Sequence, residues 1–174
     1  MTFEEIYHLH KNMVFNLALQ YVQNTEDAEE ITQDVFVSIH QSIDSFNQNS
    51  KLSTWIYRIT INRSLDYVKA KQRKKRFGFL TSLFYDDTND VKHNAPHFDH
   101  PGVLMEHKEG LKNLFEQINQ LPDKQRTALI LSKMEQKSQN EIAEVMDLSP
   151  KAVESLVQRA KTNLSKKLNQ SEGK

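Results

Sequence analysis

The residues best suited to chemistry are five polar side chains that lie between positions 151 and 159. The last four follow the first by three, four, seven and eight residues, which places all five on one face of a helix. The five are Lys151, Glu154, Ser155, Gln158 and Arg159. Side chains of these types donate to or accept from the base edges exposed in the major groove of DNA. We therefore ask which element presents this face.

A helix-turn-helix spacing surrounds these residues. Ser138 followed by Glu141 is a capping box, which predicts the start of a first helix. Asp147 tolerates the left-handed backbone of a tight turn, and Ser149-Pro150 supplies an N-cap and a first-turn proline for a second helix. Such a motif places its second helix in the major groove. An ordinary αα-hairpin with a solvated outer face is the alternative. Apolar side chains that would pack the two helices together are Ile142, Ala143, Met146, Leu148, Val153 and Val157.

A second segment with nucleic-acid chemistry lies upstream. Six cations occur in the eight residues 69–76, and their mutual repulsion favours a polyanionic partner. Aromatic side chains at Phe46, Trp55, Tyr57 and Tyr67 are interleaved with cations, and aromatic faces can stack on unpaired bases. This combination suits single-stranded or melting DNA better than intact duplex. For Trp55 itself we favour a place in the hydrophobic core.

The composition predicts a helical protein. Of 174 residues only four are Gly and four are Pro, and abundant Leu, Ile, Glu, Gln and Lys favour helices. The absence of Cys excludes disulfides and thiolate metal sites and is consistent with a reducing cytoplasm. No apolar run approaches the roughly 20 residues that span a bilayer, and the N-terminus does not resemble a signal peptide. We therefore expect a cytoplasmic protein without membrane insertion.

The net charge of zero hides two basic blocks. Residues 1–50 contain eight acidic residues and one basic residue, whereas residues 51–76 contain nine basic residues and one acidic residue. The chain is acidic again over residues 77–110 and basic from residue 151 onward. Local fields govern the binding of a polyanion more than the net charge does. The neutral total therefore does not exclude DNA binding.

Helical periodicity divides the chain into two parts. Apolar positions recur at helical spacing over residues 3–22, over 25–42 with Thr25 as the expected cap, from about residue 53 into the basic run, and again from residue 103. Residues 86–102 are polar and acidic and contain two prolines, which predicts an exposed linker. We therefore expect an all-α protein with two small helical domains, residues 1–85 and 103–174, joined by a flexible linker at 86–102.

Taken in order, these segments resemble the extracytoplasmic-function (ECF) group of bacterial RNA polymerase sigma factors. The first half has DAEEITQDVF at residues 27–36, then Phe46, and TWIYRITIN at residues 54–62. The second half has LPDKQR at residues 121–126, then EIA at 141–143 and RAK at 159–161. The motifs cover nearly the whole chain, and together they are more specific than any one alone.

The resemblance implies a protein that is not an enzyme and needs no cofactor. It implies that residues 1–85 form region two, which binds core RNA polymerase and melts and reads the minus-ten element of a promoter. An acidic helix face would dock on polymerase, an aromatic ring and an amide would shape a pocket for a flipped base, and cations would hold the DNA backbone. The implied polymerase-binding residues are Asp27, Glu30, Gln33 and Asp34. The implied minus-ten residues are Phe46, Asn62, Lys69, Arg73 and Lys74.

Residues 103–174 would form region four and read the minus-35 element through the outer face of the second helix. Glu154 departs from the family, in which a basic residue is common at this position. A carboxylate cannot hold phosphate but can accept from cytosine N4, so we expect an altered minus-35 preference. Leu52 replaces a common aromatic at the rim of the base pocket. The family also implies an anti-sigma factor, often membrane-anchored, as a further partner beside polymerase and promoter DNA.

Two other functions are alternatives. A free-standing helix-turn-helix regulator would bind duplex DNA without polymerase. A metal-dependent enzyme or sensor would use His93, His97 and His100 with Asp90 and Asp99, because imidazoles at such spacings can bind zinc or nickel. A His-rich polar linker without metal is the interpretation we favour for that segment.

Overall fold

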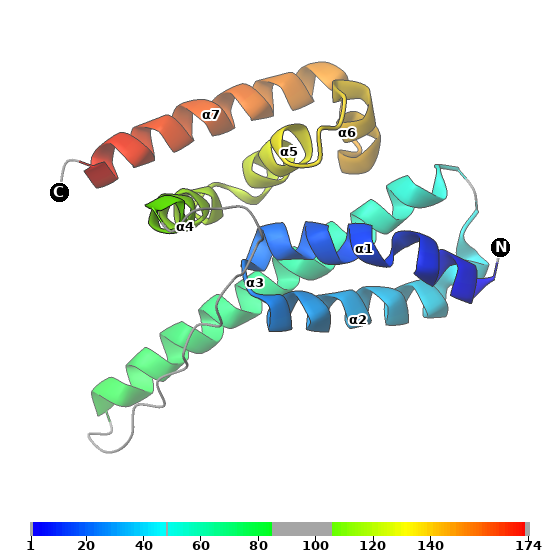
Figure 1. Cartoon of the computed structure of the whole chain (residues 1–174), viewed down its shortest axis with the longest axis horizontal. Coiled ribbons are helices and arrows are strands. Elements are labelled where there is room, and N and C mark those ends of the chain that lie inside the picture. The colour runs from blue at the N-terminus through cyan, green and yellow to red at the C-terminus, as the bar shows by residue number, and fades with distance from the viewer. Residues whose placement is uncertain (1, 48, 85–105, 173–174) are drawn as a thin grey trace.

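The protein is built from α-helices (Figure 1). The computed structural model describes residues 2–47, 49–84 and 106–172, and these residues form seven α-helices, one short 3-10 helix and no strand. The N-terminal half contains α1 (Phe3–Val22), α2 (Thr25–Ser42), the 3-10 helix η1 (Ile43–Ser45) and α3 (Leu52–Phe84). The C-terminal half contains α4 (Glu106–Asn119), α5 (Asp123–Lys133), α6 (Gln139–Met146) and α7 (Pro150–Glu172). The predicted all-α fold is confirmed, and the predicted linker lies outside the described residues.

The start of α2 differs by one residue from the prediction. Asn24, not Thr25, is the N-cap, and its side chain accepts a hydrogen bond from the Asp27 backbone N–H at 2.8 Å. Asn and Thr are both favoured at caps, so residue type alone did not distinguish them. The extended backbone of Asn24 (φ −142°, ψ 128°) identifies it as the cap, since Thr25 is already helical.

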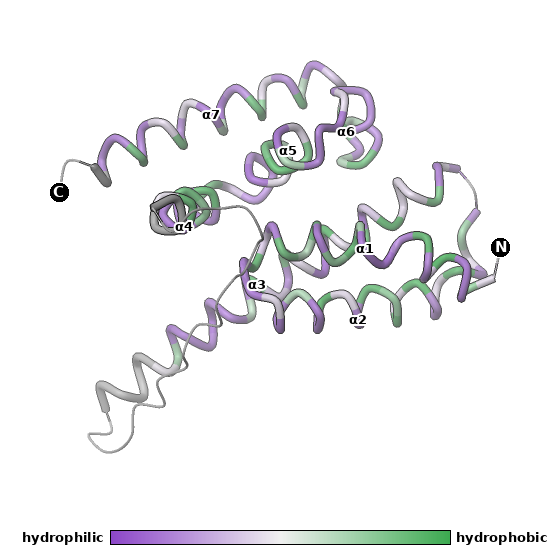
Figure 2. Tube along the Cα trace, viewed as in Figure 1, coloured by the Kyte–Doolittle hydropathy of each residue, from purple (hydrophilic) through white to green (hydrophobic). Residues whose placement is uncertain are grey.

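Each half has a hydrophobic cluster of its own, and Figure 2 shows the apolar side of the helices turned inward. The N-terminal cluster joins α1, α2 and the start of α3 through Ile6, Val14, Ala18, Ala28, Ile31, Val35, Phe36, Ile39 and Ile56. The C-terminal cluster joins α4, α5 and α7 through Ile118, Leu121, Leu129 and Ala160.

A third cluster crosses between the two halves. Leu17 and Tyr21 of α1 and Tyr57 and Ile61 of α3 pack against α5 and the helix-turn-helix, and α5 and α6 lie beside α1 and α3 in Figure 1. Their partners are Ile130, Leu131, Ile142, Ala143, Val145 and Val153. The sequence predicted two helical domains on a flexible linker, and it did not identify which side chains of the two domains would meet. Helical periodicity marked Leu17 and Tyr21 as inward-facing, but it cannot say which neighbour they face.

Candidate nucleic-acid interface

The predicted helix-turn-helix consists of α6, a tight turn and α7. The Glu141 backbone N–H donates to Ser138 Oγ at 3.2 Å, and the Ser138 N–H donates to the Glu141 carboxylate at 2.8 Å, so the capping box is present. The bond from the Ser138 backbone lowers the pKa of Glu141. Asp147 has φ 54° in the turn, Ser149 Oγ accepts a backbone N–H of the next helix, and Pro150 is the first residue of α7. The local chemistry of the sequence thus positions the second helix as predicted.

The outer face of α7 carries the five side chains singled out for base contacts. All of them are exposed: Lys151, Glu154, Ser155, Gln158 and Arg159. Ser155 Oγ donates to the Lys151 carbonyl at 3.1 Å, so its remaining capacity toward solvent is as an acceptor. The opposite face of α7 is fixed by Val153, which is fully buried in the shared cluster.

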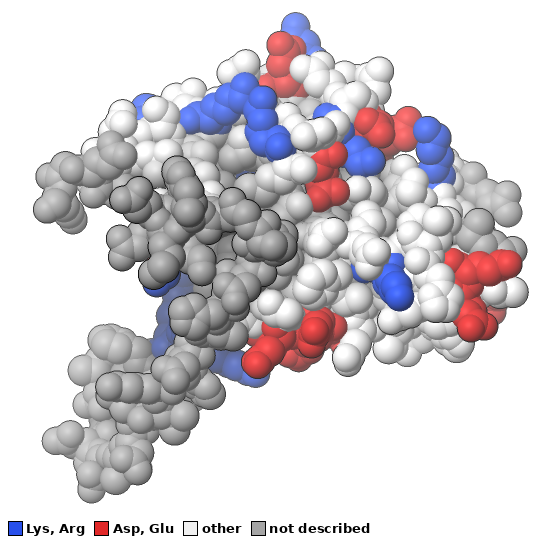
Figure 3. All heavy atoms as spheres, in the orientation of Figure 1, with Lys and Arg blue, Asp and Glu red and all other residues white. Residues whose placement is uncertain are grey.

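Three of the four predicted polymerase-binding side chains are exposed on α2: Glu30, Gln33 and Asp34. The side chain of Asp27 is only 15 % exposed. Tyr67 of α3 donates to Asp27 Oδ1 at 2.7 Å and to Glu30 Oε2 at 3.1 Å, and Lys71 pairs with Asp27 Oδ2. Burial, followed by the bond to Asp27, raises the pKa of Tyr67, so this hydroxyl remains a donor. Asp27 therefore connects α2 to α3, and Figure 3 shows acidic side chains over the start of α2 beside basic ones of α3.

Three of the four predicted minus-ten residues of α3 follow one stripe of the helix, together with Trp55. Trp55, Asn62, Lys69 and Arg73 are separated by seven, seven and four residues, which keeps them on one face. Trp55 is half-buried against the N-terminal core, as predicted, whereas the other three are exposed. Lys74 is also exposed but lies about 100° around the helix from Arg73. A groove of about 450 Å³ follows the stripe, lined by Asp66, Lys69, Gln72, Arg73 and Arg76.

Phe46 meets this stripe at its N-terminal end. Its ring lies 5.0 Å from that of Trp55, centroid to centroid, at an interplanar angle of 34°. Trp55 therefore packs on the core with one part and supports Phe46 with another. Asn62, the other predicted pocket residue, lies two helical turns beyond Trp55 and does not line the cleft that contains Phe46. The structure thus does not bring Phe46 and Asn62 together in that cleft.

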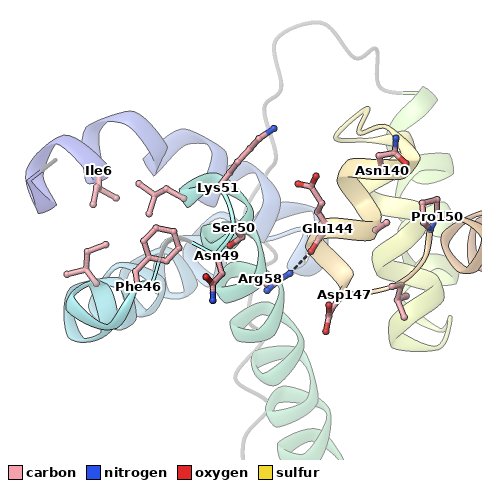
Figure 4. A pocket seen from close by; sticks show the side chains of 14 residues that line it. Ile6, Phe46, Asn49, Ser50, Lys51, Arg58, Asn140, Glu144, Asp147 and Pro150 are labelled. Carbon is pink, nitrogen blue, oxygen red and sulfur yellow. Dashed lines mark hydrogen bonds between the residues drawn. The ribbon is translucent and has the colours of Figure 1, made fainter.

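A cleft of about 1320 Å³ separates the loop before α3 from the helix-turn-helix (Figure 4). Arg58 bridges it, because its Nη2 donates to the Glu144 carbonyl at 2.6 Å and its Nε donates to the Val145 carbonyl at 3.1 Å. These carbonyls belong to the last turn of α6, where a cation is favourable. The first wall includes Phe46, Asn49, Ser50, Lys51 and Leu52, and the second includes Asn140, Ala143, Glu144, Asp147, Leu148 and Pro150. The sequence marked Arg58 only as part of the motif at residues 54–62, and no spacing predicted its hydrogen bonds to the end of α6.

Glu135 makes a second connection between the halves that the sequence did not reveal. It lies in the turn before α6 and accepts from Gln20 Nε2 at 2.7 Å and from the Tyr57 hydroxyl at 2.8 Å. Burial and the bond to Glu135 raise the pKa of Tyr57, which keeps the hydroxyl protonated as the donor.

The LPDKQR motif has a structural role in this arrangement. Arg126 is 2 % exposed, and its Nη2 donates to Asp123 Oδ1 at 2.8 Å while its guanidinium carbon lies 5.7 Å from the ring centroid of Tyr21. Asp123 also pairs with Lys69 of α3 at 2.7 Å. Burial would raise the pKa of Asp123, but the bonds from Lys69 and Arg126 outweigh it and lower that pKa. The motif therefore joins the start of α5 to both α1 and α3.

No group of three His, Asp or Glu side chains within the described residues could hold a metal ion. The candidate metal residues His93, His97, His100, Asp90 and Asp99 all lie outside the part of the chain that the structure describes. Among the described helices, none combines the length and the apolar character needed to cross a membrane.

Comparison with known proteins assigns the family. Models of Sigma-70 region 2 and of Sigma-70, region 4 match residues 6–74 and 111–164, one in each half. The ECF RNA polymerase sigma factor SigW of Bacillus subtilis is 31% identical over 170 residues, which cover 95% of this chain and 88% of that protein. This chain belongs to the ECF group of sigma factors. The ECF sigma-E factor of Haemophilus influenzae is also 31% identical, over 160 residues that cover 91% of this chain and 83% of that protein.

Two solved structures share the fold. The sigma factor RpoE of Bartonella quintana, crystallised with the anti-sigma factor NepR, has a TM-score of 0.64 at 23% identity and covers 96% of both chains. CnrH, solved with the cytosolic domain of CnrY, has the same TM-score at 22% identity and covers 97% of this chain and 88% of that one. As a member of this family, which is not one of enzymes, the ECF factor directs promoter-specific initiation by RNA polymerase. The free-standing regulator is not favoured, because both sigma regions are present.

Proposed function

We propose that the two halves of this ECF sigma factor divide the work of promoter recognition. Residues 1–85 act as region two, which binds core polymerase and the minus-ten element, and residues 103–174 act as region four, which reads the minus-35 element. The observation that carries the proposal is the match of one sigma region to each half, each with exposed side chains of fitting chemistry.

The polymerase-binding face in this proposal is the exposed side of α2. Glu30, Gln33 and Asp34 supply carboxylate and amide groups there. Asp27 acts indirectly, because its bonds to Tyr67 and Lys71 set the position of α2 against α3. Docking of α2 on polymerase would therefore also fix the direction of the basic helix.

The minus-ten element would be held along α3. Phe46, supported from behind by Trp55, offers a stacking face that can compensate part of the cost of extruding a base. Asn62 offers one donor group and one acceptor to a base edge. Lys69, Arg73 and Lys74 would hold the DNA backbone next to that base.

The minus-35 element would be read by the exposed face of α7, where Gln158 and Arg159 can donate to base edges and Glu154 can accept from cytosine. Two structural neighbours were solved with partner proteins, one of them the anti-sigma factor NepR. We extend that mode of control to this chain and propose an anti-sigma partner for it. The sigma factor itself would act in the cytoplasm, where core polymerase is found.

Run-off transcription tests the proposal. Bacterial core polymerase is incubated with fragmented genomic DNA from the source organism, with and without the protein. We expect initiation sites that depend on the protein and that are lost with Asn62→Ala but kept with Asn12→Ala, a matched change at an exposed position of α1. Binding of duplex DNA by the protein alone, without any new initiation site, would instead support a free-standing regulator.

A further inference from the structure

One acidic residue interrupts the basic part of α3. Asp66 is the single acid in residues 51–76, which contain nine basic residues. It is exposed, and it lines the groove of about 450 Å³ together with Lys69 and Arg73, which the proposed function assigns to the DNA backbone. A carboxylate at this place repels the phosphates that the neighbouring cations attract. A role in binding the DNA backbone therefore does not account for Asp66.

An ion pair within α3 does not account for it either. The cations three residues before and after Asp66 are bonded elsewhere, because Arg63 Nε donates to Ser38 Oγ at 3.1 Å and Lys69 pairs with Asp123 at 2.7 Å. Four residues on, where an acid on a helix can also find a cation, the chain has an alanine. In the part of the chain that the structure describes, no hydrogen bond or ion pair holds the Asp66 carboxylate. Its oxygens are therefore available to a partner in the groove.

The cations of α3 lie on both sides of Asp66. Each residue of a helix is rotated by about 100°, so Lys69 lies about 60° to one side of Asp66 and Lys74 about 80° to the other. The major groove of DNA is about 12 Å wide and admits an α-helix, with the two phosphate backbones as its walls and the base edges as its floor. If α3 enters that groove, the flanking cations face the two backbones and Asp66 faces the bases.

Asp66 also lies close to the residue that the proposed function assigns to a base. It follows Asn62 by four residues, which keeps both side chains on one face of α3. The two positions are about 6 Å apart along the helix axis, and successive bases of one strand are about 3.4 Å apart in duplex DNA. A strand that follows α3 therefore brings a base to Asp66 one or two steps from the base at Asn62.

The chemistry of a carboxylate limits which base it can bind. An ionised carboxylate only accepts hydrogen bonds. In the major groove, cytosine and adenine each present an amino group, whereas thymine presents a carbonyl oxygen and guanine presents only acceptors. Asp66 can accept from the amino group of the first two bases, and it is repelled by the carbonyl oxygen of the other two.

We propose that Asp66 determines part of the minus-ten specificity: its carboxylate accepts a hydrogen bond from the amino group of a cytosine or adenine and disfavours guanine and thymine at that position. The same charge lowers the affinity for all other sequences, which is a form of discrimination against wrong partners. The inference rests on the proposed function, because it requires that α3 bind the minus-ten element.

Selection of DNA by the reconstituted holoenzyme tests the proposal. Core polymerase with wild-type, Asp66→Ala or Glu116→Ala protein binds duplexes of a promoter found by run-off transcription, randomised over its minus-ten element, and the bound duplexes are sequenced. Glu116→Ala is the matched control, because it removes the same charge from an exposed position of α4, outside the groove. With the wild type and the control we expect one position where cytosine or adenine is preferred about tenfold over guanine and thymine. With Asp66→Ala we expect this preference to disappear.

Base analogues identify the contact itself. Deoxyzebularine lacks only the amino group of deoxycytidine, and deoxynebularine lacks only that of deoxyadenosine. At the selected position, the analogue should weaken binding of the wild-type holoenzyme about tenfold more than that of the Asp66→Ala holoenzyme. An equal loss with both proteins would show that another group reads the amino group, and the proposal would be wrong.

A purely electrostatic role gives a different result. If Asp66→Ala strengthens binding to every sequence by the same factor and leaves the selected sequence unchanged, Asp66 only repels the backbone and the proposal is refuted. If Asp66→Ala does not fold, Asp66→Asn serves instead. The amide of Asn can donate as well as accept, so we expect guanine or thymine to be admitted at that position, and an unchanged selection would count against the proposal.

The wild-type arm of the selection reports on the proposed function separately. A wild-type holoenzyme that selects no minus-ten sequence would contradict the proposed function, and with it the role of Asp66. A wild-type preference that persists unchanged in the Asp66 variants would contradict the role of Asp66 alone.

Discussion

Asp27 and Asp34 lie seven residues apart on α2, yet their replacement by Asn should have different consequences. Asp27→Asn removes the charge that pairs with Lys71, weakens the acceptor for Tyr67 and removes a negative charge from the first turn of α2. Hydrogen bonds to charged groups contribute about 1.5–3 kcal/mol and a charge at the helix start about 0.3–1 kcal/mol. Lys71 is half-exposed, so its pair with Asp27 is discounted for screening by solvent.

The net loss for Asp27→Asn is then about 2 kcal/mol in the free energy of unfolding. For a chain of this size, that loss lowers Tm by about 4–8 °C. Asp34 is exposed, and surface substitutions usually change stability by less than about 0.5 kcal/mol. If α2 is the polymerase-binding face, Asp34→Asn should instead weaken polymerase binding, by about tenfold.

Two measurements on both variants separate these effects: thermal unfolding followed by circular dichroism, and binding of labelled protein to core polymerase followed by fluorescence anisotropy. The wild-type protein and Asn12→Ala provide the reference. An Asp27→Asn protein with wild-type Tm and the binding defect of Asp34→Asn would refute the reasoning. Asp27 would then be a polymerase contact, and its bonds to Tyr67 and Lys71 would contribute little.

Four further predictions concern the C-terminal half and the basic helix. Ser138→Ala removes the N-cap of α6 and should lower the free energy of unfolding by about 1 kcal/mol in denaturant titrations. In the folded protein the pKa of Glu141 lies below its ordinary value of 4.5. The contribution of the ionised carboxylate to folding stability is therefore present above pH 4.5 and is lost as the pH falls through the folded pKa. Thermal scans at a series of acid pH values would show this loss as a falling Tm. Glu154→Ala should relax a preference for cytosine in the minus-35 element, worth about 1–3 kcal/mol, in binding selections with holoenzyme; an unchanged selected sequence would contradict this. Arg73→Ala should reduce the slope of log affinity against log salt by about 0.9 without changing the selected sequence.

The features that could be predicted from the sequence are those set within one or two helical turns. The capping box of Ser138 and Glu141, the left-handed Asp147 and the proline that opens α7 depend only on neighbouring residues, and all are present. The cap of α2 was misplaced because Asn24 and Thr25 are adjacent and both suited to the position. The outer face of α7 followed from the same local periodicity.

The contacts that could not be predicted are those between distant segments. Nothing in the local sequence of Glu135 distinguishes it from a solvated glutamate, yet it receives hydrogen bonds from two helices of the other half. Arg58 bonds to carbonyls at the end of α6, and carbonyls carry no signal in residue type. The site residues Phe46 and Asn62 came from family resemblance, and their separation in the folded chain depends on the loop before α3, whose course periodicity does not describe.

The unbroken length of α3 has a mechanical consequence. A helix of 33 residues is a rod of about 50 Å, with Trp55 near one end, the basic residues toward the other and Tyr67 fastened to α2 between them. Because each residue turns such a rod by about 100°, deleting one residue between Asn62 and Tyr67 would rotate the basic groove away from the base-reading end. Inserting seven residues there would restore the angle within about 20° while lengthening the rod by about 10 Å. The number of residues in α3 therefore sets both the distance and the relative rotation between its base-reading end and its basic residues.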